Sequence, residues 1–153
     1  MTERLSQITL ESSDGRAPSP EIEQEQNVAI FDLIEENHFA LKHAPVGPYQ
    51  LALGLAGSRL TFDLKCEDGS AATQFTVTLG ELRQIVKDYT QICASYYEAV
   101  RSKPPAEIEV LDEARRAIHL EGARTLITVL DDYAVLDEDT ARRLFTLVCA
   151  LAA

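Results

Sequence analysis

The segment from Leu79 to Leu130 most constrains the fold, because it carries two long apolar patterns of helical spacing around a Pro-Pro pair. In the first pattern, apolar side chains recur three or four residues apart and form one stripe: Leu82, Ile85, Val86, Tyr89, Ile92, Cys93, Tyr96 and Val100. Pro104 and Pro105 cannot continue that helix, but Pro105 can open a second one that ends near Leu130. The segment therefore predicts a long α-hairpin.

Three segments before the hairpin alternate apolar and polar side chains with a period of two, which is typical of half-buried strands. They cover about residues 49–55, 60–66 and 73–79, and short turns separate them. Such short connections predict an antiparallel meander. Polar residues at the alternate positions of the second and third strands predict that helices cover only one face of the sheet.

The N-terminal third predicts one more strand and one more helix. Residues 4–11 alternate loosely enough for a short strand, and a Ser/Gly/Pro loop follows at residues 12–19. Ser19 favours an N-cap and Pro20 the first helical position, so a helix should start there. Several glutamates follow, which the helix dipole favours. The helix should end at a loop over residues 38–48.

The C-terminal half contains further helix signals. Thr78 and Glu81 have the spacing of a capping box and should open the first hairpin helix. Residues 133–136 predict a short extended piece, and Asp137 should cap a last helix that ends near Leu151. That helix is apolar around most of its circumference, which predicts deep burial.

Together these elements predict a single α+β domain over residues 1–153. We expect a three- or four-stranded antiparallel meander sheet with helices packed on one face, including the long α-hairpin. A chain of 153 residues with 46% hydrophobic residues is large enough to bury a substantial core.

The charge of the chain excludes some classes of partner. The 25 acidic and 14 basic residues give a net charge of -11, which disfavours nucleic acids and anionic membranes. No apolar run is long enough to span a bilayer, and the N-terminus lacks the apolar core of a secretory signal. Cys66, Cys93 and Cys149 lie far apart, so we expect reduced thiols in a cytoplasmic protein.

Most sequence signatures of enzymes are absent. The chain has no glycine-rich phosphate loop, no nucleophile elbow and no zinc-protease motif. His38, His43 and His119 are not spaced as metal ligands with cysteine or carboxylate. We therefore expect no metal and no cofactor.

One polar cluster departs from plain packing. Asp112, Arg115 and His119 fall beside the apolar stripe of the second hairpin helix instead of opposite it. If the two helices are antiparallel, Tyr89 and Tyr96 of the first helix face this cluster. Such a group could bind an anion or a carboxylate, so these five residues are the candidate ligand-binding site.

A structural role explains the same residues. Asp112 can pair with Arg115 and Arg116 on one helix face, and His119 can bond a tyrosine hydroxyl. Gly122, on the same side, would let a neighbouring side chain approach closely, at a cost in helix stability of about 1 kcal/mol.

A second pair of arginines, Arg142 and Arg143, follows Glu138 and Asp139 by four residues, which suggests surface ion pairs. Alternatively, these arginines meet the acidic helix at residues 21–36, either within the fold or across a dimer.

Long stretches of the chain resemble an uncharacterised family of short acidic alphaproteobacterial proteins. The stretches are SPEIEQEQNVAIFDLIEEN, GPYQLAL, IVKDYTQICASYYEAVRS, ARRAIHLEG and DTARRLFTLVCAL. The resemblance implies a single-domain bacterial cytosolic protein. It implies no reaction, cofactor or functional residue.

We expect a cytosolic, non-enzymatic interaction or regulatory protein that binds a protein partner or a second copy of itself. The missing catalytic signatures, the acidic first helix and the apolar last helix favour this function. The alternative is a small enzyme or anionic-ligand sensor with an Asp/Arg/His/Tyr pocket between the two long helices. An acidic secretion-type chaperone ranks third, because the long helices stand where its strands would be expected.

Overall fold

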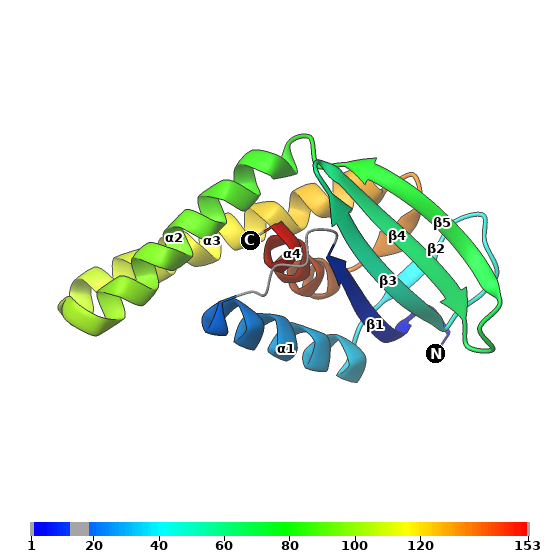
Figure 1. Cartoon of the computed structure of the whole chain (residues 1–153), viewed down its shortest axis with the longest axis horizontal. Coiled ribbons are helices and arrows are strands. Elements are labelled where there is room, and N and C mark those ends of the chain that lie inside the picture. Colours follow the sequence, from blue (N-terminus) through cyan, green and yellow to red (C-terminus); the bar gives the residue numbers. More distant parts are fainter. Residues whose placement is uncertain (1, 13–18, 153) are drawn as a thin grey trace.

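Six strands and four helices build the part of the chain that the computed structural model describes, residues 2–12 and 19–152 (Figure 1). The strands are β1 (Leu5–Ser12), β2 (Phe39–Leu41), β3 (Tyr49–Ala56), β4 (Arg59–Cys66), β5 (Ala71–Thr78) and β6 (Ala134–Leu136). The helices are α1 (Pro20–Glu35), α2 (Leu82–Ser102), α3 (Pro105–Leu130) and α4 (Glu138–Ala152). The predicted α+β class is confirmed. Residues 13–18 of the loop predicted at 12–19 lie outside the described residues.

The main sheet has the strand order β1-β3-β4-β5. The meander β3-β4-β5 is antiparallel as predicted, but β1 pairs with β3 in parallel. The expectation of a purely antiparallel sheet was therefore wrong at this edge. The connection through α1 and β2 returns the chain to the end of the sheet where β1 began, so β3 runs in the same direction. An irregularity between Leu5 and Gln7 explains the loose alternation, because it lets Leu5 and Ile8 both face the core.

A second, two-stranded sheet replaces part of the loop expected at residues 38–48. β2 pairs antiparallel with β6, and Phe39 stands opposite Leu136. The extended piece at 133–136 is therefore confirmed, whereas β2 was missed. A strand of three residues contains too few alternations to show a period, although the burial of Phe39 is complete.

Two of the three predicted helix caps are present. The Ser19 and Asp137 side chains each accept a backbone N–H from three residues further on. The predicted capping box of Thr78 and Glu81 was wrong, because α2 begins only after Glu81 and its N-cap residue, Glu81, makes no capping hydrogen bond with its side chain among the described residues. Gly80 adopts a positive φ of 50° between β5 and α2, and this turn separates Thr78 from the helix.

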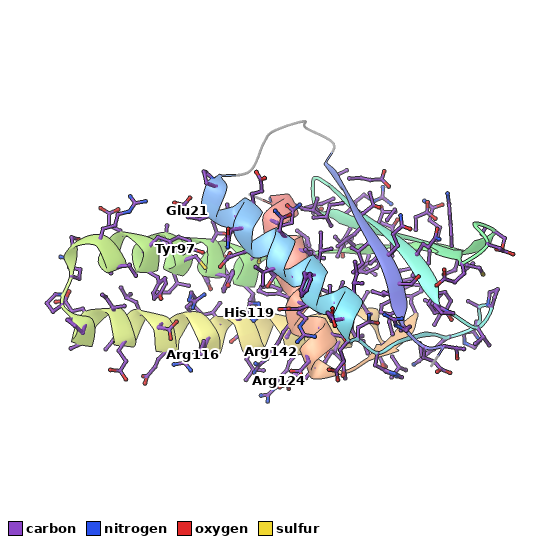
Figure 2. All side chains as sticks on the ribbon, turned by 90° about the horizontal axis from the view of Figure 1, so that it is seen from below. Glu21, Tyr97, Arg116, His119, Arg124 and Arg142 are labelled. Carbon is purple, nitrogen blue, oxygen red and sulfur yellow. The ribbon has the colours of Figure 1, made fainter. Side chains whose placement is uncertain are left out.

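The two long helices fold back on each other, as the Pro-Pro pair predicted (Figures 1 and 2). The hairpin projects from the helical side of the sheet (Figure 1). None of the helices in the described part combines the length and apolar character needed to cross a membrane.

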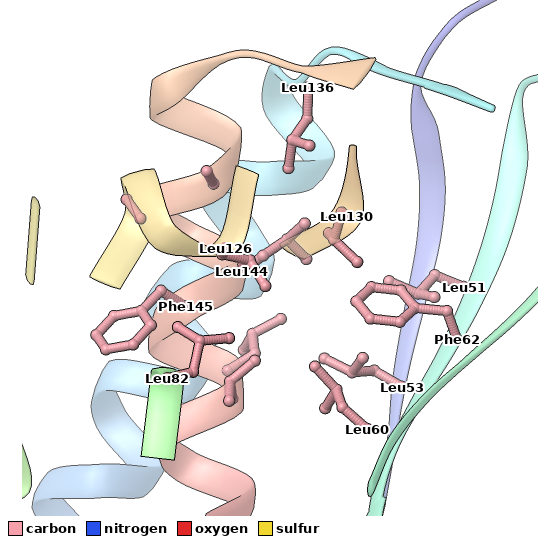
Figure 3. Packing of buried hydrophobic residues seen from close by; sticks show 14 of the residues in the cluster. Leu51, Leu53, Leu60, Phe62, Leu82, Leu126, Leu130, Leu136, Leu144 and Phe145 are labelled. Atoms are coloured by element: carbon pink, nitrogen blue, oxygen red, sulfur yellow. The ribbon is translucent and has the colours of Figure 1, made fainter. Parts of the chain in front are cut away.

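Helix α4 lies at the centre of the core and contacts α1, α2, α3, β1 and β3. Its residues Leu144 and Phe145 are fully buried, and the Phe145 ring points away from the leucines of the sheet (Figure 3). The Phe145 ring lies so close to Gly122 of α3 that a Cβ there would overlap it. The predicted close approach at Gly122 is therefore confirmed, and its partner is α4.

Candidate functional site

Helix α1 packs on α4 and reaches the hairpin through charged and hydroxyl side chains (Figure 2). Tyr97 of α2 donates a hydrogen bond of 2.8 Å to Glu25 Oε1, and Arg115 Nη1 of α3 lies 3.9 Å from the same oxygen. Near the start of α1, Arg101 Nη2 lies 3.5 Å from Glu21 Oε1. Glu25 therefore bridges α1 to both helices of the hairpin, and space remains on either side of this bridge.

Arg115 lies between a carboxylate and an aromatic ring. Its Nη2 donates to Asp112 Oδ1 at 2.6 Å, and its guanidinium carbon lies 4.6 Å from the ring centroid of Tyr96. Arg116 Nε lies 3.2 Å from the other oxygen of Asp112. The Arg115 hydrogen bond lowers the pKa of Asp112. Arg115 Nε is buried and has no hydrogen-bond partner among the described residues.

His119 sits deeper, between aromatic rings and a hydroxyl. Its Nε2 lies 2.8 Å from Thr146 Oγ1 of α4, and its ring centroid lies 5.1 Å from that of Tyr89. The partner is thus a threonine hydroxyl and not the tyrosine hydroxyl that we expected. Burial, together with the positive charges of Arg142 and Arg115, lowers the pKa of His119 to about 4. His119 is therefore neutral at physiological pH.

The cysteines near this site are protonated. Burial raises the pKa of Cys93 to about 11, and it raises the pKa of Cys149 well above its ordinary value. Burial likewise raises the pKa of Tyr89. A nucleophilic cysteine needs a lowered pKa, so neither thiol is activated for attack.

Two cavities flank the Glu25 bridge. The larger one, which we call the arginine groove, lies between α1, α3 and α4 and has a volume of about 780 Å³. Four arginines line it: Arg115, Arg116, Arg142 and Arg143. The smaller one, the inner pocket, lies between α1, α2 and α4 and has a volume of about 270 Å³. Glu25, Tyr89 and Thr146 line both cavities.

The structure brings the five predicted site residues together. The two cavities, however, lie beside the hairpin and not between its two helices. Arg115, His119 and Tyr89 line the arginine groove, whereas Asp112 and Tyr96 support Arg115 from the hairpin side. Each cavity takes one wall from α2 or α3 and the others from α1 and α4.

The sequence did not indicate that Glu25 and Thr146 belong to this site. Glu25 stood in the acidic stretch of α1, where the helix dipole explained the charge. Its bonded partner Tyr97 is 72 residues away, and Thr146 is 27 residues from His119. Helical spacing finds neighbours three or four residues apart, so it cannot detect such pairs.

Both explanations of the Arg-Arg pair on α4 hold in part. Arg142 Nη2 lies 3.7 Å from Glu138 Oε1, which is the predicted surface pair. Arg143 Nη1 donates to the backbone oxygen of Glu36 at 3.0 Å, so it contacts the end of the acidic segment within the fold.

We predict that His119 makes stability depend on pH. Its pKa is about 4 in the folded protein and ordinarily 6.5. Between these values the unfolded chain binds the proton that the folded chain refuses, so the free energy of unfolding should fall as pH drops from 6.5 to 4. Urea unfolding of the wild type and of His119→Gln at pH 7 and pH 5 measures this contribution. His119→Gln should lose less stability than the wild type, and His38→Gln, at an exposed position, is the control. Equal losses in the wild type and His119→Gln would contradict the prediction.

The comparisons with known proteins show family membership without an assigned activity. UPF0262 proteins of Ruegeria pomeroyi and Paracoccus denitrificans are 52% and 54% identical to the chain, which covers 95% and 94% of their lengths; 97% of the chain is matched in each case. A UPF0262 protein of Jannaschia is 54% identical, with 94% of each chain covered. No solved structure matches the chain. The predicted resemblance is confirmed: residues 2–153 match in full, and the chain belongs to the uncharacterised protein family UPF0262.

Proposed function

We propose that this protein is a non-enzymatic interaction protein of the cytoplasm and that it self-associates through the outer face of α1. The observation that carries the proposal is an apolar stripe on α1 that the fold leaves uncovered. Val28, Phe31 and Ile34 are 49%, 66% and 40% exposed. They lie opposite Ala29 and Leu33, which fix α1 to the core. Free thiols at three positions suit a reducing compartment.

Charge complementarity favours a second copy of the chain as the occupant of this face. Helix α1 carries five acidic residues and no basic residue. Beside it, the arginine groove presents Arg116 and Arg142, whose side chains are 68% and 44% exposed. In a two-fold dimer, the acidic edge of one α1 can therefore meet the arginines of the partner while the apolar stripes pack together.

The apolar contacts should decide the affinity. Burying a large apolar side chain contributes about 1.5–3 kcal/mol, whereas an exposed ion pair contributes about 0–1 kcal/mol. In a two-fold dimer, each of these apolar side chains is buried on both copies, so its contribution to the affinity is doubled. The arginines then set the orientation of the two copies, and they offset the repulsion expected from a net charge of -11 per chain.

The ordered polar groups of the site support binding over catalysis. Arg115 is held by Asp112, His119 by Thr146, and the nearby thiols are protonated. These hydrogen bonds therefore hold the side chains of Arg115 and His119 in place, and neither thiol is activated as a nucleophile.

We predict that Phe31→Glu weakens self-association more than tenfold, because it puts a charge into the centre of the apolar stripe. Val110→Glu is the matched control, since Val110 on α3 is also 66% exposed but lies away from α1. Sedimentation velocity over a concentration series measures the association. A strictly monomeric wild type at high concentration would contradict the proposal, and so would equal effects of the two variants.

A second candidate function is the sensing of a small anion in the arginine groove. The four lining arginines favour it, and so does the buried Arg115 Nε, which has no hydrogen-bond partner within residues 2–12 and 19–152. Glu25, Asp32 and Glu113 also line the groove, so the arginines exceed the carboxylates by only one. Because this excess of positive charge is small, we rank anion sensing below self-association.

If the groove binds anions, inorganic phosphate or succinate at millimolar concentration should raise the melting temperature. Arg142→Gln should abolish that shift without lowering the melting temperature of the ligand-free protein, because the ion pair of Arg142 in the described part of the chain is an exposed one with Glu138. Lys103→Gln, on the exposed corner of the hairpin, is the control. The candidate fails if neither anion shifts the wild type, or if the shift persists in Arg142→Gln.

A further inference from the structure

The inner pocket is a cavity of the right size for a small organic molecule. Its volume is about 270 Å³, and an apolar cavity of roughly 150 Å³ can hold benzene. Helices α1, α2 and α4 border it, one side is open to solvent, and the two tyrosines Tyr89 and Tyr97 contribute to its wall. Small or apolar side chains make up much of the rest: Ile22, Cys93, Ala94, Cys149 and Ala150. A six-membered ring with a short side chain fits such a space.

The charged groups of the pocket favour a cation. Three carboxylates line it, from Glu21, Glu25 and Glu98, against the single guanidinium of Arg101. Arg101 is occupied by Glu21 at 3.5 Å, and its side chain is 74% exposed. Glu25 lies at the opposite end, where the Tyr97 hydroxyl donates to its Oε1 and Arg115 Nη1, from outside the pocket, lies 3.9 Å from the same oxygen. The three carboxylates thus still exceed the two nearby guanidiniums. The Glu25 charge also helps to raise the pKa of Cys93, for which burial is the largest cause, so this charge acts on the wall of the pocket.

We propose that the inner pocket binds a small organic amine, with its ammonium group beside Glu25 and its apolar body against Tyr89, Tyr97 and Ile22. The ammonium group can donate to the carboxylate, and the tyrosine rings can stabilise its charge through their faces. Polar groups gathered at one end of a cavity fix the orientation of a ligand. The arginine groove, on the other side of Glu25, has the opposite balance, with one arginine more than it has carboxylates.

Three probes of similar shape and different charge test this assignment by NMR titration of the wild type. They are phenethylamine, 2-phenylethanol and phenylacetate. Phenethylamine should bind at least ten times more tightly than 2-phenylethanol, and phenylacetate should bind least. The proposal is overturned if the alcohol binds as tightly as the amine, or if no amine binding is detected at millimolar concentration.

Two variants locate the binding. Glu25→Gln keeps an acceptor for Tyr97 but removes the charge, so amine affinity should fall to the level of the alcohol while alcohol affinity stays the same. Glu23→Gln, an exposed position on the same helix that does not line the pocket, is the matched control and should bind the amine as the wild type does. Amine affinity that is unchanged in Glu25→Gln would overturn the assignment.

Should Glu25→Gln fail to fold, Ala94→Leu provides an independent test. Ala94 lines the pocket from α2, and a leucine there should fill it and abolish binding of both the amine and the alcohol. Persistent amine binding in this variant would place the ligand elsewhere. A monomer contains the whole pocket, so this proposal and the self-association through α1 can fail separately.

Discussion

The burial of α4 is the constraint on which the arrangement of the other elements depends. Its side chains Leu144, Phe145, Leu147 and Val148 are fully buried, so neighbours must cover nearly every side of this helix. The sheet covers one side and α3 another, with Gly122 admitting the Phe145 ring. Only an outer side remains for α1, which therefore touches the hairpin through Glu25 and Glu21 and leaves its own outer face bare.

This arrangement concentrates the candidate sites around one short helix. The Glu25 bridge separates an arginine-lined groove from a carboxylate-lined pocket, and we propose that these two sides of α1 take ligands of opposite charge. The third, outward side is apolar. Because α1 has few buried side chains of its own, changes on any of these three sides should affect how firmly it sits on α4.

The periodic spacing of apolar residues predicted those elements that present one continuous apolar face to the core. The apolar stripe of α2 and the alternating pattern of β3 to β5 extend over many residues. Helix α4 is apolar around most of its circumference, and it is deeply buried as that pattern predicted. The sequence did not predict the direction of β1 or the existence of β2. Strand direction depends on where a crossover of many residues returns, and β2 is too short to show a period.

The candidate site was predictable only along one helix. The helical pattern identified Asp112, Arg115 and His119 as polar residues beside an apolar stripe. It also identified Gly122 as a position without a side chain, where a neighbour can approach closely. The partners of these residues come from other helices, far away in the sequence. Helical spacing could therefore not identify Glu25 and Thr146. Val28, Phe31 and Ile34 belong to a wide apolar face of α1, yet they face outward because α4 contacts only a narrow strip of this helix.

Hydrogen exchange of the backbone amides of α1, measured at low and high protein concentration, tests most directly whether the outer face of this helix is an association surface. A partner on that face would slow the local opening of α1. Exchange at residues 22–35 should therefore slow as concentration rises, while the tip of the hairpin at residues 99–110 should exchange at a constant rate. Exchange in α1 that does not depend on concentration would contradict this account.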